Sequence, residues 1–194
     1  MSDFWLYFKL GLDHVLDWAA YDHLLFIVVL CTAYTFSSWR RLLLLVTIFT
    51  VGHTTSLFLS NYGIANVSST WIEFLIPITI LTTAGYNMFI ARMSRSEEKT
   101  GILFFAALFF GIIHGFGFGR YFNQINDEQE LMPLLEFALG IETAQIIVVL
   151  IVLILASMSQ IFVRFKKRDW ILVVSSIVIG MTIPMLIENW PFGE

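Results

Sequence analysis

Long, nearly uncharged apolar runs recur along this chain of 194 residues from Leu24 onward. An α-helix needs about 20 such residues to cross the hydrocarbon core of a bilayer. The runs give a composition that is 58% hydrophobic and 13% charged, with a mean hydropathy of +0.80. Water-soluble domains of this length do not have such a composition. We therefore expect the chain to fold with lipid as its solvent.

The boundaries of the runs predict an all-α fold, a polytopic membrane helix bundle that forms a single domain over residues 1–194. A separate short helix is expected over residues 4–18, at the membrane interface. If that helix continued to Phe36 it would be a rod of about 50 Å, against a hydrocarbon core of about 30 Å. Six spanning helices are expected near residues 21–36, 42–60, 70–90, 102–118, 139–162 and 170–189.

Basic residues predict how the bundle is oriented, because cytoplasmic loops of membrane proteins carry an excess of Lys and Arg. They follow the first, third and fifth expected spans, whereas the alternate loops hold a single basic residue, Arg120. The basic loops should therefore be cytoplasmic and both termini should face outward. The residues that carry this prediction are Arg40 and Arg41, then Arg92, Arg95 and Lys99, and then Arg164, Lys166, Lys167 and Arg168.

All four histidines of the chain lie in or beside the apolar runs. An imidazole in lipid is costly unless it is paired, binds a metal or faces water. Taken one at a time, each histidine is better explained by packing or by an interhelical hydrogen bond. Taken together, the predicted orientation places them in the outer half of the membrane, where mutual coordination explains them better. The four residues are His14, His23, His53 and His114.

Carboxylates accompany the histidines at the same expected depth. Imidazole nitrogen and carboxylate oxygen suit divalent cations such as Zn²⁺, Ni²⁺ or Co²⁺, and the single Cys31 provides no thiolate cluster. The sequence therefore predicts a divalent metal site. Its candidate ligands are His14, Asp22, His23, His53, Glu73, His114 and Glu142, with Asp17, Thr50, Ser56 and Gln145 as candidates to orient them.

A ladder of small residues accompanies one of these histidines. Gly111, Gly115 and Gly119 are spaced four apart, so they share one face of a helix that also carries His114. Such ladders let a second helix approach closely in membranes. We expect the backbone of another span to lie close to His114.

Five motifs in order resemble the HupE/UreJ family of bacterial membrane proteins. The resemblance covers most of the chain and fades after about Leu150. It implies uptake of nickel or cobalt and a place in the bacterial inner membrane. One departure is Ala138, which stands where the family commonly has an asparagine. The motifs are GLDHVLD and YDHLLF at 11–17 and 21–26, TIFTVGHTTSL at 47–57, IEFLI at 72–76, FGIIHGFGF at 110–118 and LGIE at 139–142.

The residues leave more than one function open. In a transporter, the histidines would strip water from a divalent cation and pass it inward. In an intramembrane hydrolase, three imidazoles would hold Zn²⁺ and its bound water, with Glu73, Asp22 or Glu142 as general base, and the substrate would be a lipid or another membrane molecule. Metal sensing without turnover is a third class. The expected partners are membrane lipids and a metal ion, with no sign of nucleic-acid binding.

Overall fold

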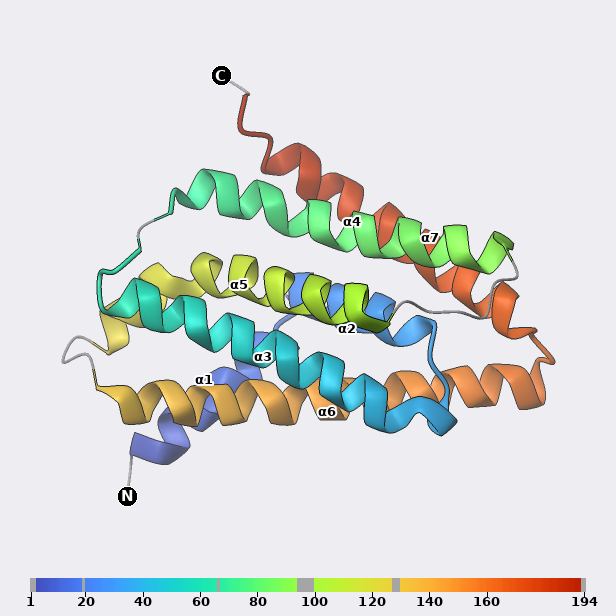
Figure 1. Cartoon of the computed structure of the whole chain (residues 1–194), viewed down its shortest axis with the longest axis horizontal. Helices are drawn as coiled ribbons and strands as arrows, with labels where there is room; N and C mark the ends of the chain where they lie inside the picture. The colour runs from blue at the N-terminus through green and yellow to red at the C-terminus, as the bar shows by residue number, and fades with distance from the viewer. Residues whose placement is uncertain (1–2, 19, 66, 94–99, 127–129, 193–194) are drawn as a thin grey trace.

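The computed structural model describes residues 3–18, 20–65, 67–93, 100–126 and 130–192, and these residues contain helices and no strand. The expected all-helical fold is confirmed. Figure 1 shows the helices lying roughly side by side along one long axis. In chain order they are α1 (Asp3–Leu16), α2 (Asp22–Thr32), the 3₁₀ turn η1 (Phe36–Ser38), α3 (Trp39–Asn61), α4 (Ser69–Met93), α5 (Thr100–Ile125), α6 (Leu131–Phe162) and α7 (Lys167–Glu188).

Five of these helices, α3 to α7, are long and apolar enough to cross a membrane, so this is a multi-pass membrane protein. The first expected span is shorter than the sequence indicated. Helix α2 has 11 residues and measures about 16 Å, roughly half of a hydrocarbon core. The helix ends because the chain turns at Ala33 and is extended at Thr35 before η1 leads into α3.

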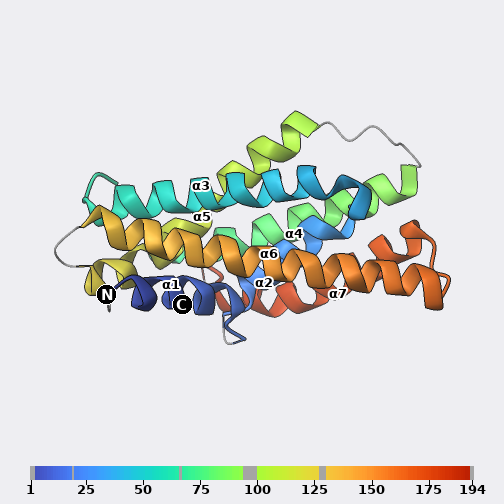
Figure 2. The ribbon, with the colours of Figure 1, turned by 90° about the horizontal axis from the view of Figure 1, so that it is seen from below.

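Helix α1 is a separate short helix, as expected, and it packs along α6; its place at the membrane interface stays a prediction. Two glycines make this contact possible, since a Cβ atom on Gly11 would overlap the carbonyl of Phe137, and one on Gly140 would overlap the carbonyl of Phe8. Figure 2 shows α1 and α6 running side by side, with α2 continuing beyond the end of α1. The two short helices therefore form an interrupted segment along α6, and the break lies between them.

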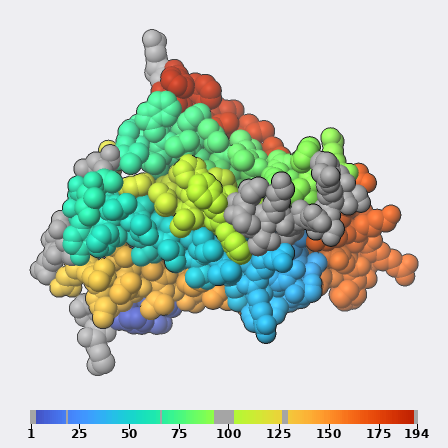
Figure 3. Space-filling view, viewed as in Figure 1, coloured from blue at the N-terminus to red at the C-terminus, as the bar shows by residue number. Residues whose placement is uncertain are grey.

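Helices α3 and α5 form the most extensive contact in the bundle, as the glycine ladder predicts. A Cβ atom on Gly111 would overlap the carbonyl of Phe49, and one on Gly115 would overlap the carbonyl of His53. Gly52 of α3 approaches the backbone of α5 in the same way. In Figure 3, α3, α4 and α5 lie next to one another on one face of the molecule. The close approach brings the backbones that carry His53 and His114 together.

Successive long helices from α3 to α7 run in opposite directions, so α3 and α5 run the same way, with α4 returning between them (Figure 1). The described basic residues of these regions consequently gather at one end of the bundle, which we call the basic end: Arg40 and Arg41 at the start of α3, Arg92 in the last turn of α4, and Arg164, Lys166, Lys167 and Arg168 where α6 gives way to α7. Arg95 and Lys99 lie outside the described residues. The opposite end contains the start of α1 and the end of α7. Helix α5 continues to Ile125, and α6 begins at Leu131, so both extend further toward this end than their hydropathy indicated.

Candidate metal centre

Three of the four histidines converge where α1, α2 and α3 meet. His14 lies near the end of α1, His23 in the first turn of α2, and His53 in the second half of α3. Each offers a ring nitrogen, and the three nitrogens lie within 4.8 Å of one another. Ring centroids are 4.5 Å apart for His14 and His23, and 5.5 Å apart for His23 and His53. One cation placed between them can be reached by all three imidazoles.

His114 adjoins this group from α5, with its ring centroid 4.9 Å from that of His23. The Nδ1 atom of His114 donates to the carbonyl oxygen of Phe110 at 2.8 Å. This bond fixes the tautomer and leaves Nε2 as the ring atom with a lone pair. All four histidines predicted from the sequence are therefore brought together by four helices.

Asp22 orients His23. Its Oδ1 atom accepts a hydrogen bond from His23 Nδ1 at 3.0 Å and another from the His23 backbone N–H at 2.8 Å. A carboxylate bonded to the far nitrogen of an imidazole is the usual support of a metal-binding histidine, because it fixes the ring and increases its basicity. His23 consequently presents Nε2 to the other histidines.

The ring nitrogens that face the cluster have no protein partner. Among the described residues, Nε2 of His14, His23 and His114 and both ring nitrogens of His53 are buried without a hydrogen bond. A buried polar atom without a partner is costly, and several in one place indicate a ligand that satisfies them. Neutral imidazole nitrogens suit a borderline divalent cation such as Ni²⁺, Co²⁺ or Zn²⁺.

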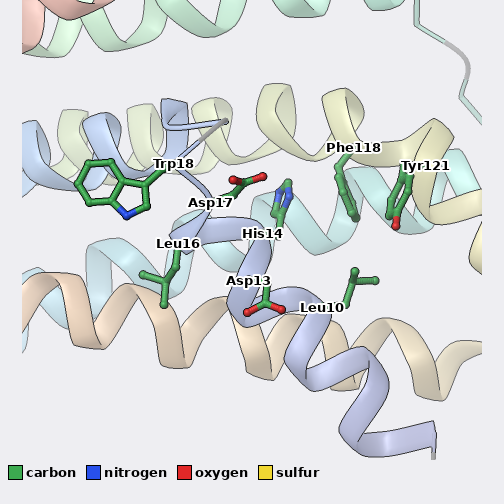
Figure 4. A pocket seen from close by; sticks show the side chains of 8 residues that line it. All are labelled: Leu10, Asp13, His14, Leu16, Asp17, Trp18, Phe118 and Tyr121. Carbon is green, nitrogen blue, oxygen red and sulfur yellow. The ribbon is translucent and has the colours of Figure 1, made fainter.

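A vestibule beside α1 opens to the surface and reaches His14 of the cluster. Its volume is about 490 Å³, and His14 forms part of its wall. Figure 4 shows Asp13 and His14 projecting from α1, and Asp17 from just after its end, across from Phe118 and Tyr121 of α5. The two exposed carboxylates place negative charge around the opening, which favours the approach of cations.

Aromatic rings surround His14 at the inner end of the vestibule. Its ring centroid lies 4.0 Å from that of Phe118, which in turn stacks on Phe137 of α6 at 5.1 Å. Burial, together with the nearby His23, holds the pKa of His14 well below its ordinary value. This lowering of the pKa favours the neutral imidazole, which is the form that binds a metal.

Glu142 is not brought to the histidines. It lies on α6 and faces α3, where Thr47 Oγ1 donates to Oε1 at 2.5 Å and Thr50 Oγ1 donates to Oε2 at 2.6 Å. The three side chains line a mainly apolar groove of about 720 Å³ between α3 and α6. Thr50, a candidate to orient a metal ligand, thus interacts with this carboxylate.

Glu73 is also away from the cluster, since its side chain is exposed on α4 while the neighbouring Ile72 is buried. Ser56 is buried, and its hydroxyl donates to the carbonyl oxygen of His53 at 2.9 Å, so it supports the backbone of a candidate ligand. Gln145 is fully buried on α6, and neither of its amide atoms has a partner among the described residues.

Sequence reasoning did not identify Thr47, nor the aromatic residues Phe118 and Phe137. The signal for Thr47 was present in its spacing, because Thr47 and Thr50 are three apart and share one face of α3. No comparable signal marked the two phenylalanines, since the chain has 19 of them. Only the helix packing shows which of them contact a histidine.

Comparison with known families identifies the family of this chain. A family model described as HupE / UreJ protein matches residues 1–189. The chain belongs to the HupE/UreJ family. The match covers nearly the whole chain and includes all four helices that carry the histidines, so this HupE/UreJ protein contains the candidate centre within the family region. No curated protein and no solved structure matches the chain.

Proposed function

We propose that this HupE/UreJ protein transports a divalent transition-metal cation of the nickel or cobalt type across the bacterial inner membrane. The observation that supports this most strongly is the convergence of His14, His23 and His53, whose unpartnered nitrogens lie within 4.8 Å of one another. Membership of a family associated with nickel and cobalt handling agrees with the choice of metal.

The proposed direction is from the vestibule to the basic end. Loops rich in Lys and Arg are cytoplasmic in most membrane proteins, which would make the opposite end the outer one. A hydrated cation would then be attracted by Asp13 and Asp17 and would lose water as imidazoles replaced its hydration shell. The cation is the cargo here, and the protein contributes the ligands and the route.

The test is uptake of Ni²⁺ or Co²⁺ into proteoliposomes that contain the purified full-length chain. Uptake should disappear in His23→Ala and in His53→Ala. The control is Glu188→Gln, which changes an exposed carboxylate at the end of α7 and should leave uptake unchanged. Normal uptake in both histidine variants would refute the proposed site. Metal binding without any uptake in the unaltered protein would refute transport.

Zinc-dependent hydrolysis is the second candidate, because three imidazoles beside an open vestibule leave room for a metal-bound water. The three carboxylates predicted as general bases are poorly placed for hydrolysis. Asp22 already accepts two hydrogen bonds from His23, Glu142 accepts two from threonines, and Glu73 is exposed. Turnover of a lipid amide or ester by the zinc-loaded protein, lost in His53→Ala, would favour this function over transport.

A further inference from the structure

His114 differs from the other three histidines in what it contacts. Among the described residues, the only histidine ring that its own ring contacts is that of His23. It does not belong to the group of three whose nitrogens lie within 4.8 Å. His23, by contrast, contacts the rings of His14, His53 and His114. The centre therefore consists of a group of three and a neighbouring pair, and His23 belongs to both.

His14 and His114 lie at opposite sides of the centre, and His23 and His53 lie between them. His14 packs on Phe118, one helical turn beyond His114 in the direction of the opposite end, and His14 lines the vestibule. His114 instead bonds to the carbonyl of Phe110, one turn nearer the basic end. A cation arriving through the vestibule would meet His14 first and His114 last.

Beyond His114, three phenylalanines form what we call the inner aromatic layer: Phe26, Phe49 and Phe110. Each lies one turn nearer the basic end than a histidine of its own helix. Phe26 stacks on Phe49 at 5.0 Å and meets Phe110 at 5.6 Å. The ring of His114 lies 5.6 Å from that of Phe26 and 5.3 Å from that of Phe49. His23 and His53 contact only Phe49 of this layer, at 6.1 and 6.2 Å, so His114 is the histidine that lies nearest to it.

Two cavities lie on the side of the inner aromatic layer that faces away from the histidines. A cavity of about 130 Å³ begins at Phe26 and Phe110 and continues along Leu30 and Thr83. A smaller cavity of about 30 Å³ shares Leu30 and Thr83 with it and reaches Asn87. The lining residues of both cavities are uncharged and include no histidine, so these cavities offer no imidazole or carboxylate to a cation beyond the inner aromatic layer.

We infer that the centre holds its cation in two successive positions, an outer one made by His14, His23 and His53 and an inner one between His23 and His114 at the inner aromatic layer. This inference rests on the proposed transport of a divalent cation. Sharing His23 lets the cation move without losing all its ligands. The inner position has fewer imidazoles and binds more weakly, which permits release.

The experiment compares His114→Ala with His53→Ala in the purified full-length chain. Equilibrium dialysis against Co²⁺ gives the affinity, X-ray absorption of the bound cobalt gives the number of coordinating imidazoles, and proteoliposomes give uptake. Loss of a ligand in His53→Ala should weaken binding by about tenfold or more. In His114→Ala the affinity and the absorption spectrum should match the unaltered protein, while uptake should be lost.

A second variant, His114→Gln, covers the case in which the alanine variant does not fold. Its amide can donate to the carbonyl of Phe110 in place of Nδ1. Weakening of Co²⁺ binding in the His114 variants as large as in His53→Ala would overturn the inference, because all four histidines would then form one position. Full uptake in the His114 variants would overturn it as well. If His53→Ala and His23→Ala also bind Co²⁺ normally, the proposed site itself fails, which is a different result.

Discussion

Removing the carboxylate of Asp22 should weaken metal binding without removing a ligand. Asp22 Oδ1 accepts from both the ring Nδ1 and the backbone N–H of His23, and 17% of its side chain is exposed. Loss of a group that orients a metal-binding histidine typically lowers affinity by about 10- to 100-fold. At about 1.4 kcal/mol for each factor of ten, this corresponds to about 1.4–2.8 kcal/mol of binding free energy.

Two substitutions separate the contributions of Asp22. In Asp22→Asn the amide oxygen can still accept the Nδ1–H bond, so the ring stays oriented and only the negative charge is lost. In Asp22→Leu both the hydrogen bond to Nδ1 and the negative charge are lost. We expect a loss of affinity near tenfold for the asparagine variant and near 100-fold for the leucine variant. Competition between the detergent-purified protein and a chelator for Co²⁺ measures both values.

The reasoning is refuted if Asp22→Leu binds Co²⁺ within about twofold of the unaltered protein, since the orienting hydrogen bond would then contribute nothing. Equal, large losses of Co²⁺ affinity in Asp22→Asn and Asp22→Leu would also refute the orienting role of Asp22. A neutral amide is a much poorer ligand than a carboxylate, so that result would make Asp22 a direct ligand. His23→Ala provides the reference for complete loss of the supported imidazole.

Three further outcomes are expected. Gly111→Ala should destabilise the protein by about 1–3 kcal/mol in detergent unfolding, because the added methyl group overlaps the backbone of α3. Gly85→Ala is the control and should not destabilise the protein, since there is open space around Gly85. Equal losses of stability in the two variants would contradict the packing argument. Glu142→Gln should leave Co²⁺ affinity unchanged, and a tenfold loss by dialysis would place this residue at the metal. Phe110→Leu should raise the initial rate of Co²⁺ uptake, and a slower rate in a stably folded variant would argue against a closed inner aromatic layer.

The convergence of the histidines could be predicted because it depends on depth, and depth follows from span boundaries and loop charges. Residues as far apart in the chain as His14 and His114 were expected near one another, and both of their rings contact that of His23. The glycine ladder likewise predicted the close approach of a second helix at Gly111 and Gly115. The first prediction uses span boundaries and loop charges, and the second uses the periodicity of a helix. A single sequence provides all of these.

Depth does not determine which way a side chain faces. This explains why Glu73 and Glu142, which were expected at the depth of the histidines, do not lie beside them. Ile72 and Ile76 are buried one turn apart on α4, and Glu73 is rotated by about 100° from Ile72, which exposes it. Ile141 is buried on α6, and the same rotation turns Glu142 toward the threonines of α3. The buried face of each helix depends on its neighbours, which a single sequence does not provide.

The inner aromatic layer depends on chain direction as well. Helix α2 runs toward the basic end, so Phe26 lies three residues after His23, whereas α3 and α5 run the other way, so Phe49 and Phe110 lie four residues before their histidines. Opposite offsets in the sequence thus produce one layer in space. Transport along the proposed route requires this layer to open for each cation, whereas hydrolysis at the vestibule does not. The response of uptake and of zinc-dependent turnover to Phe110→Leu therefore distinguishes the two functions at a residue that binds no metal.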